Sequence, residues 1–156
     1  MFEDFLTTAL KEALDMYPGE TVGQYPAFLD EAELNSRTGD RVRMLVDIVH
    51  SVDSAPAMVF DAKYKAASPS GAYPNADHYQ MLAYCTALEV SRGWLIYAGA
   101  GIPRVRRVRN TEISVVEFPI DLSQAPEDLL ARVKFLTESA FNEWRVDAGA
   151  RLRSAS

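Results

Sequence analysis

The chain has 156 residues, of which 48% are hydrophobic and 24% are charged. This length suits one domain with its own core, and no apolar run reaches the length of a membrane span. The single cysteine, Cys85, excludes an internal disulfide, and with only two histidines it argues against a structural zinc site. The net charge of -6 argues against a dedicated DNA-binding module, because such modules carry a basic surface. The N-terminus lacks a signal-peptide pattern, so we expect a cytoplasmic protein.

The first half of the chain predicts one helix followed by three strands. Apolar residues recur at helical spacing over Met1–Met16, and Tyr17-Pro18-Gly19 ends that helix. After loop-like residues, Ala27–Leu34 gives a weak strand pattern, with turn residues at 35–40. Two stretches rich in β-branched and apolar residues then predict a hairpin with its turn at 51–56: Arg41–Val49 and Ala57–Lys65.

The second half alternates helices and strands. A loop at 68–75 precedes a helix over Asp77–Arg92, which Gly93 is expected to end. Two strands follow on either side of a connection rich in glycine and arginine at 99–109: Trp94–Ala98 and Glu112–Pro119. A last amphipathic helix is predicted over Pro126–Arg145, followed by a frayed tail at 147–156. We therefore expect one α/β domain over 1–146, with a mixed central sheet flanked by helices.

Two of the predicted strands carry residues suited to metal-dependent hydrolysis of a phosphodiester. Side chains alternate across a strand, so Asp61, Lys63 and Lys65 share one face. Asp47 is a lone acid inside an apolar strand, where a buried charge needs a partner or a metal ion. If the two strands pair, Asp47 and Asp61 come together, and Mg²⁺ is commonly held by one or two carboxylates.

Other interpretations of these residues stay open. An Asp-x-Lys sequence is common and usually lies on a solvated strand edge. An ion pair between Asp47 and Lys63 would also explain the acid in the apolar strand without any chemistry. The coincidence of both acids with a lysine gives the metal-site hypothesis equal standing with these alternatives.

The helix predicted from Asp77 combines an apolar and a polar face. Asp77, Gln80 and Tyr84 stand at i, i+3 and i+7 and therefore share the polar face. That face suits either a support for a site at the sheet edge or an ordinary solvent face with Asp77 at the N-cap. We expect Cys85 in the core and His78 in a structural role.

A basic cluster follows the fourth predicted strand, at Arg104, Arg106, Arg107 and Arg109. It suits contact with a DNA backbone, as does Lys65, but a solvated loop or a partner interface fits the same residues equally well. No G-x-x-x-x-G-K-[ST] sequence occurs, so the chain encodes no nucleotide-driven motor.

Three motifs in succession resemble McrC-like nuclease domains of the PD-(D/E)XK superfamily. They are Asp47, the strand Asp61-Ala62-Lys63-Tyr64-Lys65 and the helix Asp77-x-Tyr79-Gln80-Met81-Leu82-Ala83-Tyr84. The resemblance extends from the first helix to about Tyr97, and more weakly to the last strand and helix. It departs from the family at Val46, where a proline usually precedes the first Asp. It implies a restriction-endonuclease-like core of αβββαβ order, plus a C-terminal strand and helix.

The resemblance also implies roles for individual residues. Asp47, Asp61 and, from the first helix, Glu3 would bind the metal, which would be Mg²⁺ or Mn²⁺. Lys63 would orient the attacking water or stabilise the pentavalent phosphate. Gln80 and Tyr84 would support the site.

The function expected from these motifs is a Mg²⁺-dependent DNA endonuclease, the cleavage component of a modification-dependent restriction system that acts against foreign DNA. An McrB-like AAA+ GTPase would be its partner, and recognition of modified cytosine would come from that partner. One alternative is a RecB-like exonuclease or repair nuclease, which would use the same metal site on DNA ends. Another is an inactive nuclease fold serving as a binding or assembly subunit, which the acidic net charge favours slightly.

Overall fold

The computed structural model describes residues 2–32, 40–64 and 73–154. Helices and strands follow in the order expected for an α/β fold with a mixed sheet, so that prediction is confirmed. Their bounds are α1 Phe2–Leu14, β1 Glu20–Phe28, β2 Arg43–Val52, β3 Ala55–Lys63, α2 Asn75–Leu88, β4 Arg92–Ala98, β5 Arg104–Arg107, β6 Ser114–Ile120 and α3 Pro126–Ser154.

The strands form one six-stranded sheet in the order β1-β2-β3-β4-β6-β5. The first three strands make an antiparallel meander, and β3, β4 and β6 run parallel to one another. The hairpin between β2 and β3 turns at Asp53 and Ser54, which both adopt positive φ, as the tightest hairpin turns require. Since parallel neighbours need a crossover, α2 passes over one face of the sheet between β3 and β4.

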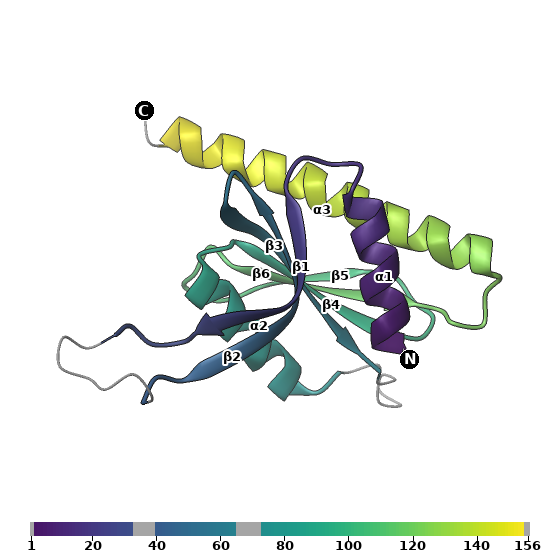
Figure 1. Cartoon of the computed structure of the whole chain (residues 1–156), viewed down its shortest axis with the longest axis horizontal. Coiled ribbons are helices and arrows are strands. Elements are labelled where there is room, and N and C mark those ends of the chain that lie inside the picture. Colours follow the sequence, from purple (N-terminus) through teal and green to yellow (C-terminus); the bar gives the residue numbers. More distant parts are fainter. Residues whose placement is uncertain (1, 33–39, 65–72, 155–156) are drawn as a thin grey trace.

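Two apolar cores lie on opposite faces of the sheet. Figure 1 shows α1 and α3 on one side and α2 on the other, with the far ends of β1 and β2 projecting from the body of the molecule. Leu10 of α1 and Leu136 of α3 pack with Phe60 of β3 in the larger core. Met81 and Cys85 of α2 pack in the smaller one. Phe60 of β3 therefore packs under α1 and α3, and its neighbour Val59 packs under α2.

Helix α2 ends earlier than the sequence predicted, and Gly93 has another role. The helix stops at Leu88, with Glu89 in the left-handed conformation at the C-cap, rather than continuing to Arg92. Gly93 lies in β4 under the helix, where an added Cβ would collide with Met81 and lie 2.9 Å from Cys85 Sγ. Gly93 thus lets α2 approach the sheet closely.

Two further predictions are corrected by the structure. The first strand lies at Glu20–Phe28, not Ala27–Leu34, because Pro26 is tolerated on an edge strand whose pairing with β2 supplies the order. Residues 33–39 lie outside the described part. The connection 99–109 contains the short strand β5, which pairs with β6.

Helix α3 reaches Ser154 instead of ending at Arg145, so most of the segment 147–156 expected to fray is helical. Alanine, leucine and arginine favour this extension, and Asp147 anchors it by contacts with Ser91 and Arg92. Among the described helices, none combines the length and the apolar character that crossing a membrane requires.

Candidate metal and nuclease site

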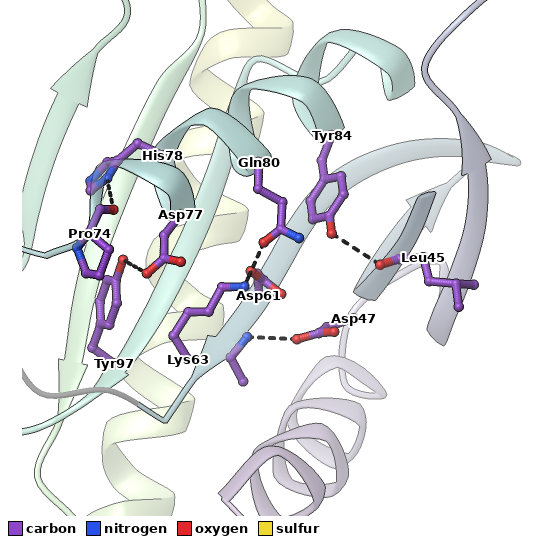
Figure 2. Close-up of polar contacts among 11 residues, drawn as sticks. Leu45, Asp47, Asp61, Lys63, Pro74, Asp77, His78, Gln80, Tyr84 and Tyr97 are labelled. Atoms are coloured by element: carbon purple, nitrogen blue, oxygen red, sulfur yellow. Dashed lines mark hydrogen bonds and ion pairs between the residues drawn. The ribbon is translucent and has the colours of Figure 1, made fainter. Parts of the chain in front are cut away.

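The structure brings Asp47 of β2 and Asp61 of β3 together. Oδ2 of Asp47 accepts a hydrogen bond of 3.1 Å from the backbone N–H of Ala62, which fixes the Asp47 side chain against β3 (Figure 2). The Asp47 carboxylate also acts on Asp61 by hydrogen bonding and by charge. The expected hairpin therefore delivers two carboxylates to one point on the sheet.

The carboxyl of Asp61 is in an unusual electrostatic environment. Burial raises its pKa, and the neighbouring Asp47 raises it further, against the lowering effect of Lys63, so that the pKa is about 7. A buried carboxyl next to a second carboxylate resists ionisation. A cation beside Asp61 would relieve this cost.

Lys63 lies beside Asp61 on the same face of β3. Its Nζ is 2.8 Å from Asp61 Oδ2 and donates a hydrogen bond of 2.6 Å to Oε1 of Gln80. Burial alone would lower the pKa of Lys63, but Asp61, with Asp77 and Asp47 adding to it, outweighs burial and raises that pKa. The lysine is thus held as a cation whose partner is Asp61, not the Asp47 that the salt-bridge alternative named.

The contact between Lys63 and Asp61 is an ion pair, with Nζ facing Oδ2. Within the described residues, the buried Oδ2 of Asp61 has no hydrogen-bond partner, although it faces Nζ of Lys63. A buried carboxylate oxygen of this kind retains the capacity to bind a metal ion. This leaves the strand-edge interpretation without support, since Asp61 is 2% exposed.

Helix α2 supplies the other side of the site. Gln80 reaches down to Lys63, and the hydroxyl of Tyr84 donates a 3.3 Å hydrogen bond to the carbonyl of Leu45 (Figure 2). Burial, together with the charges of Asp61 and Asp47, raises the pKa of Tyr84 to about 12, so it remains a neutral donor. Tyr84 therefore ties α2 to the strand that carries Asp47.

Asp77 is buried rather than exposed at a helix cap. It is 3% exposed, and its Oδ2 accepts a 3.1 Å hydrogen bond from the hydroxyl of Tyr97. The N-cap position belongs to Pro74, which makes no side-chain cap. The solvent-face interpretation of this helix is therefore wrong for Asp77 and Tyr84, whereas Gln80 is exposed.

The remaining predicted site residues do not join Asp47 and Asp61 within the described part of the chain. Glu3 falls in the first turn of α1, but its side chain lies outside the described part, as does all of Lys65. The arginines of β5 do not form one surface, because Arg106 binds Glu117 whereas Arg107 lines a pocket with Asp147. Arg104 and Arg109 are exposed.

A third buried acid, Glu117 of β6, was missed by the sequence interpretation. Its Oε2 accepts hydrogen bonds from Nε2 of His78 (2.6 Å) and Nε of Arg106 (2.7 Å). Glu117 pairs with Leu95, and Leu95 pairs with Asp61, so both acids stand in one row across the sheet. The signal was present, because Glu117 interrupts an apolar strand just as Asp47 does.

In the described residues, no group of three or more His, Cys, Asp or Glu side chains is arranged to hold a metal ion. Two carboxylates, Asp47 and Asp61, are nevertheless adjacent, and Asp61 has a buried oxygen without a hydrogen-bond partner there. Mg²⁺ usually takes one or two protein carboxylates and keeps several waters. The pair fits such an ion.

The chain is similar to a known family and to a solved structure. The family described as McrBC 5-methylcytosine restriction system component matches residues 1–98. Among solved structures, the present chain is similar to a chain of the half-complex from the tetradecameric assembly of Thermococcus gammatolerans McrB AAA+ hexamers with bound McrC. The match has a TM-score of 0.64 at 14% identity and covers 88% of the present chain but 32% of the other. No curated protein matches the chain.

Proposed function

The chain belongs to the McrBC 5-methylcytosine restriction system component family, and from that premise we propose that it is a metal-dependent DNA endonuclease domain. The observation that carries the proposal is the adjacency of Asp47, Asp61 and Lys63, with one buried Asp61 oxygen lacking a hydrogen-bond partner among the described residues. In this proposal the reaction is hydrolysis of a phosphodiester bond by water.

Asp47 and Asp61 would hold Mg²⁺, or Mn²⁺ in its place. When bound, the ion lowers the pKa of a coordinated water and neutralises charge on the phosphate. Metal binding would keep Asp61 ionised, because a nearby dication offsets the effects that raise its pKa.

Lys63 would act on the phosphate and on the attacking water. Its ammonium donates to Gln80 and pairs with Asp61, so its position is fixed from α2 and from β3 at once. A fixed cation stabilises the negative charge that develops on the phosphate oxygens without reorganising during the reaction. Gln80 is then a positioning residue for Lys63, and Tyr84 is a positioning residue for the strand of Asp47.

A GTPase partner would complete the system. The similar solved structure is a complex of McrB AAA+ hexamers with bound McrC, and the present chain spans 32% of the chain it matches there. We therefore propose an McrB-like AAA+ partner, which would supply DNA recognition and switch cleavage on. The net charge of -6 agrees with a domain that relies on a partner for much of its hold on DNA.

The test is cleavage of circular plasmid DNA with Mg²⁺ or Mn²⁺, with and without an McrB-like GTPase. Wild type is compared with Asp61→Asn and Lys63→Met, and with Asp128→Asn as a control on the exposed face of α3. We expect nicking or linearisation by wild type and by the control, and none by the two site variants. Cleavage that survives in both site variants would sink the proposal, and activity on linear DNA alone would point to an exonuclease.

One observation favours an assembly subunit as the second candidate. The described residues place only two carboxylates together, and no third acid joins them there. Calorimetric titration with Mn²⁺ separates the two functions. Binding by wild type that is lost in Asp61→Asn supports the nuclease, whereas absence of binding together with intact binding to the GTPase supports the assembly role.

A further inference from the structure

A polar cleft lies on the side of Asp47 that faces away from Lys63 and from Gln80 and Tyr84 of α2. It has a volume of about 490 Å³ and is formed between α1 and the β1–β2 pair. Its lining includes Thr7, Thr8 and Lys11 of α1, Gly23 and Gln24 of β1, and Asp47 of β2. Figure 2 shows α1 on the side of Asp47 away from Gln80 and Tyr84. Asp47 is thus shared between the candidate metal site and this cleft.

The backbone is strained where the cleft meets Asp47. Gly23 pairs with Ile48 and Tyr25 pairs with Val46, but the pairing skips Gln24 and Asp47. Gln24 adopts φ 51°, a left-handed conformation that costs free energy for a residue with a side chain. The alternation of side chains in β2 is also interrupted at Asp47. Val46 and Ile48 would share a face in a regular strand, but Val46 lies with Val49 in one core and Ile48 lies in the other. Strain of this kind is retained where function requires it.

The α1 wall of the cleft carries a cation and hydroxyl groups that can donate to a phosphate. Lys11 extends over Gly23, since a Cβ added to Gly23 would lie 3.5 Å from Nζ of Lys11 and 3.6 Å from Cγ2 of Thr7. The absence of a side chain at Gly23 therefore keeps space open beneath the ammonium group. Hydroxyls of Thr7 and Thr8 stand along the same helix, and a backbone phosphate needs a cation and donors of this type.

Asp4 and Asp47 also line the cleft, and their carboxylates repel a phosphate that has no counterion. Binding of a phosphate becomes favourable only if a cation at Asp47 neutralises that end of the cleft. The cleft is thus matched to a phosphate placed between Lys11 and a metal held by Asp47.

We propose that this cleft binds a backbone phosphate of the DNA strand that is cut, with Lys11 as the contacting cation. The inference rests on the proposed function, because the metal at Asp47 is part of the phosphate's binding site. Lys11 holds the strand and takes no part in the bond-breaking step. The cleft thus gives the strand a path from the α1 side of the sheet across Asp47 to Lys63.

The experiment measures binding of a fluorescent duplex oligonucleotide by anisotropy, in Ca²⁺ and at several salt concentrations, with the GTPase partner and without it. Lys11→Met is compared with Lys134→Met, which removes an exposed lysine from α3, and with Lys11→Arg, which keeps the charge. Each phosphate contact adds about 0.9 to the slope of log K against log salt. We expect Lys11→Met to lower that slope by about 1 with metal binding unchanged, and both other variants to match wild type.

A second variant tests the space itself. Gly23→Val places a branched side chain under Lys11 and suits a strand, so it should weaken DNA binding several-fold while the unfolding midpoint stays near that of wild type. A wild-type slope in Lys11→Met together with wild-type affinity in Gly23→Val would overturn the inference while leaving the proposed function intact. Failure of wild type to bind DNA or metal at all would overturn the proposed function with it.

The source of the phosphate is separated by competition. At matched ionic strength, and below the solubility limit of calcium phosphate, inorganic phosphate should displace the oligonucleotide from wild type more strongly than chloride does. This difference should vanish in Lys11→Met if the oligonucleotide occupies the cleft. Phosphate that binds wild type by calorimetry but displaces the oligonucleotide no better than chloride would assign the cleft to the free anion and overturn the inference.

Discussion

The carboxyl groups of Asp47 and Asp61 meet across the β2–β3 hairpin, and Asp47 helps to raise the pKa of Asp61 to about 7. This contact joins residues of two strands, β2 and β3, in one site. It also makes the folded protein sensitive to pH, because the folded state holds a proton on Asp61 that the unfolded chain releases.

Stability should fall as the pH rises through the titration of Asp61. Its pKa is 3.8 in the unfolded chain and about 7 in the fold, chiefly through burial and then through Asp47. Between these values the folded state binds more protons, so the free energy of unfolding decreases with rising pH. Asp61→Asn should flatten this dependence and be the more stable protein at about pH 8 without metal. Urea unfolding across this range measures the difference, with Asp128→Asn expected to follow wild type; equal pH dependence in all three proteins would contradict the prediction.

Gln80 should affect the rate of cleavage rather than metal binding. Its Oε1 accepts from Lys63 at 2.6 Å and so holds the ammonium in place. Gln80→Met removes the acceptor and should lower kcat by about tenfold to a hundredfold, the scale that misplacement of a reacting group produces. Gln80→Glu keeps an acceptor and should retain more activity. Gln124→Met, at an exposed position, is the control, and calorimetry should show unchanged Mn²⁺ affinity. A loss of metal affinity equal to the loss of rate would count against this role.

Tyr84→Phe should destabilise the fold modestly. The variant deletes the hydroxyl that donates to the carbonyl of Leu45 and keeps the buried ring. The expected loss is about 1 kcal/mol of unfolding free energy, as for other single hydrogen bonds. Tyr79, which is 68% exposed on the same helix, provides the matched variant Tyr79→Phe, with no expected effect. Chemical denaturation decides the matter, and equal midpoints for the two variants would refute the role of the hydroxyl.

Glu117→Gln should weaken the link between α2 and β5. Burial would raise the pKa of Glu117, but hydrogen bonds from Arg106 and His78 outweigh burial and lower it. A lowered folded-state pKa stabilises the fold above the ordinary value of 4.5, and this contribution is lost as the pH falls through the folded value. We expect a loss of about 2 kcal/mol at about pH 7, since hydrogen bonds to charged groups are involved. The loss should shrink in acid, and exposed Glu112→Gln should show neither effect. A constant loss at every pH would contradict the ionic origin.

Much of the fold follows from local patterns in the sequence. The helical repeat in α1 and the two β-branched stretches around Asp53 and Ser54 predicted a helix and a hairpin, which are present. Local patterns failed for β1, where Gly23 and Pro26 hide the strand, and for β5, which is exposed along its length. Both are edge strands, and their order comes from a neighbouring strand rather than from their own side chains.

Local patterns in the sequence also predicted part of the candidate site. Asp61 and Lys63 share a strand face by simple alternation, and Asp47 stood out as an acid in an apolar strand. Glu117 carried the same signal and was overlooked. No local pattern indicated that Lys63 pairs with Asp61 and Gln80, or that Asp77 is buried against Tyr97.

The sequence by itself determined which groups this protein can use: two acids, a lysine and a glutamine at spacings that strands and helices convert into shared faces. The tertiary structure alone decided their electrostatics. Burial and the approach of Asp47 raise the pKa of Asp61. Lys63 forms an ion pair with Asp61 and a hydrogen bond with Gln80 of α2. Spacing along a strand fixes the direction of a side chain, whereas desolvation and charge depend on segments that only folding brings near.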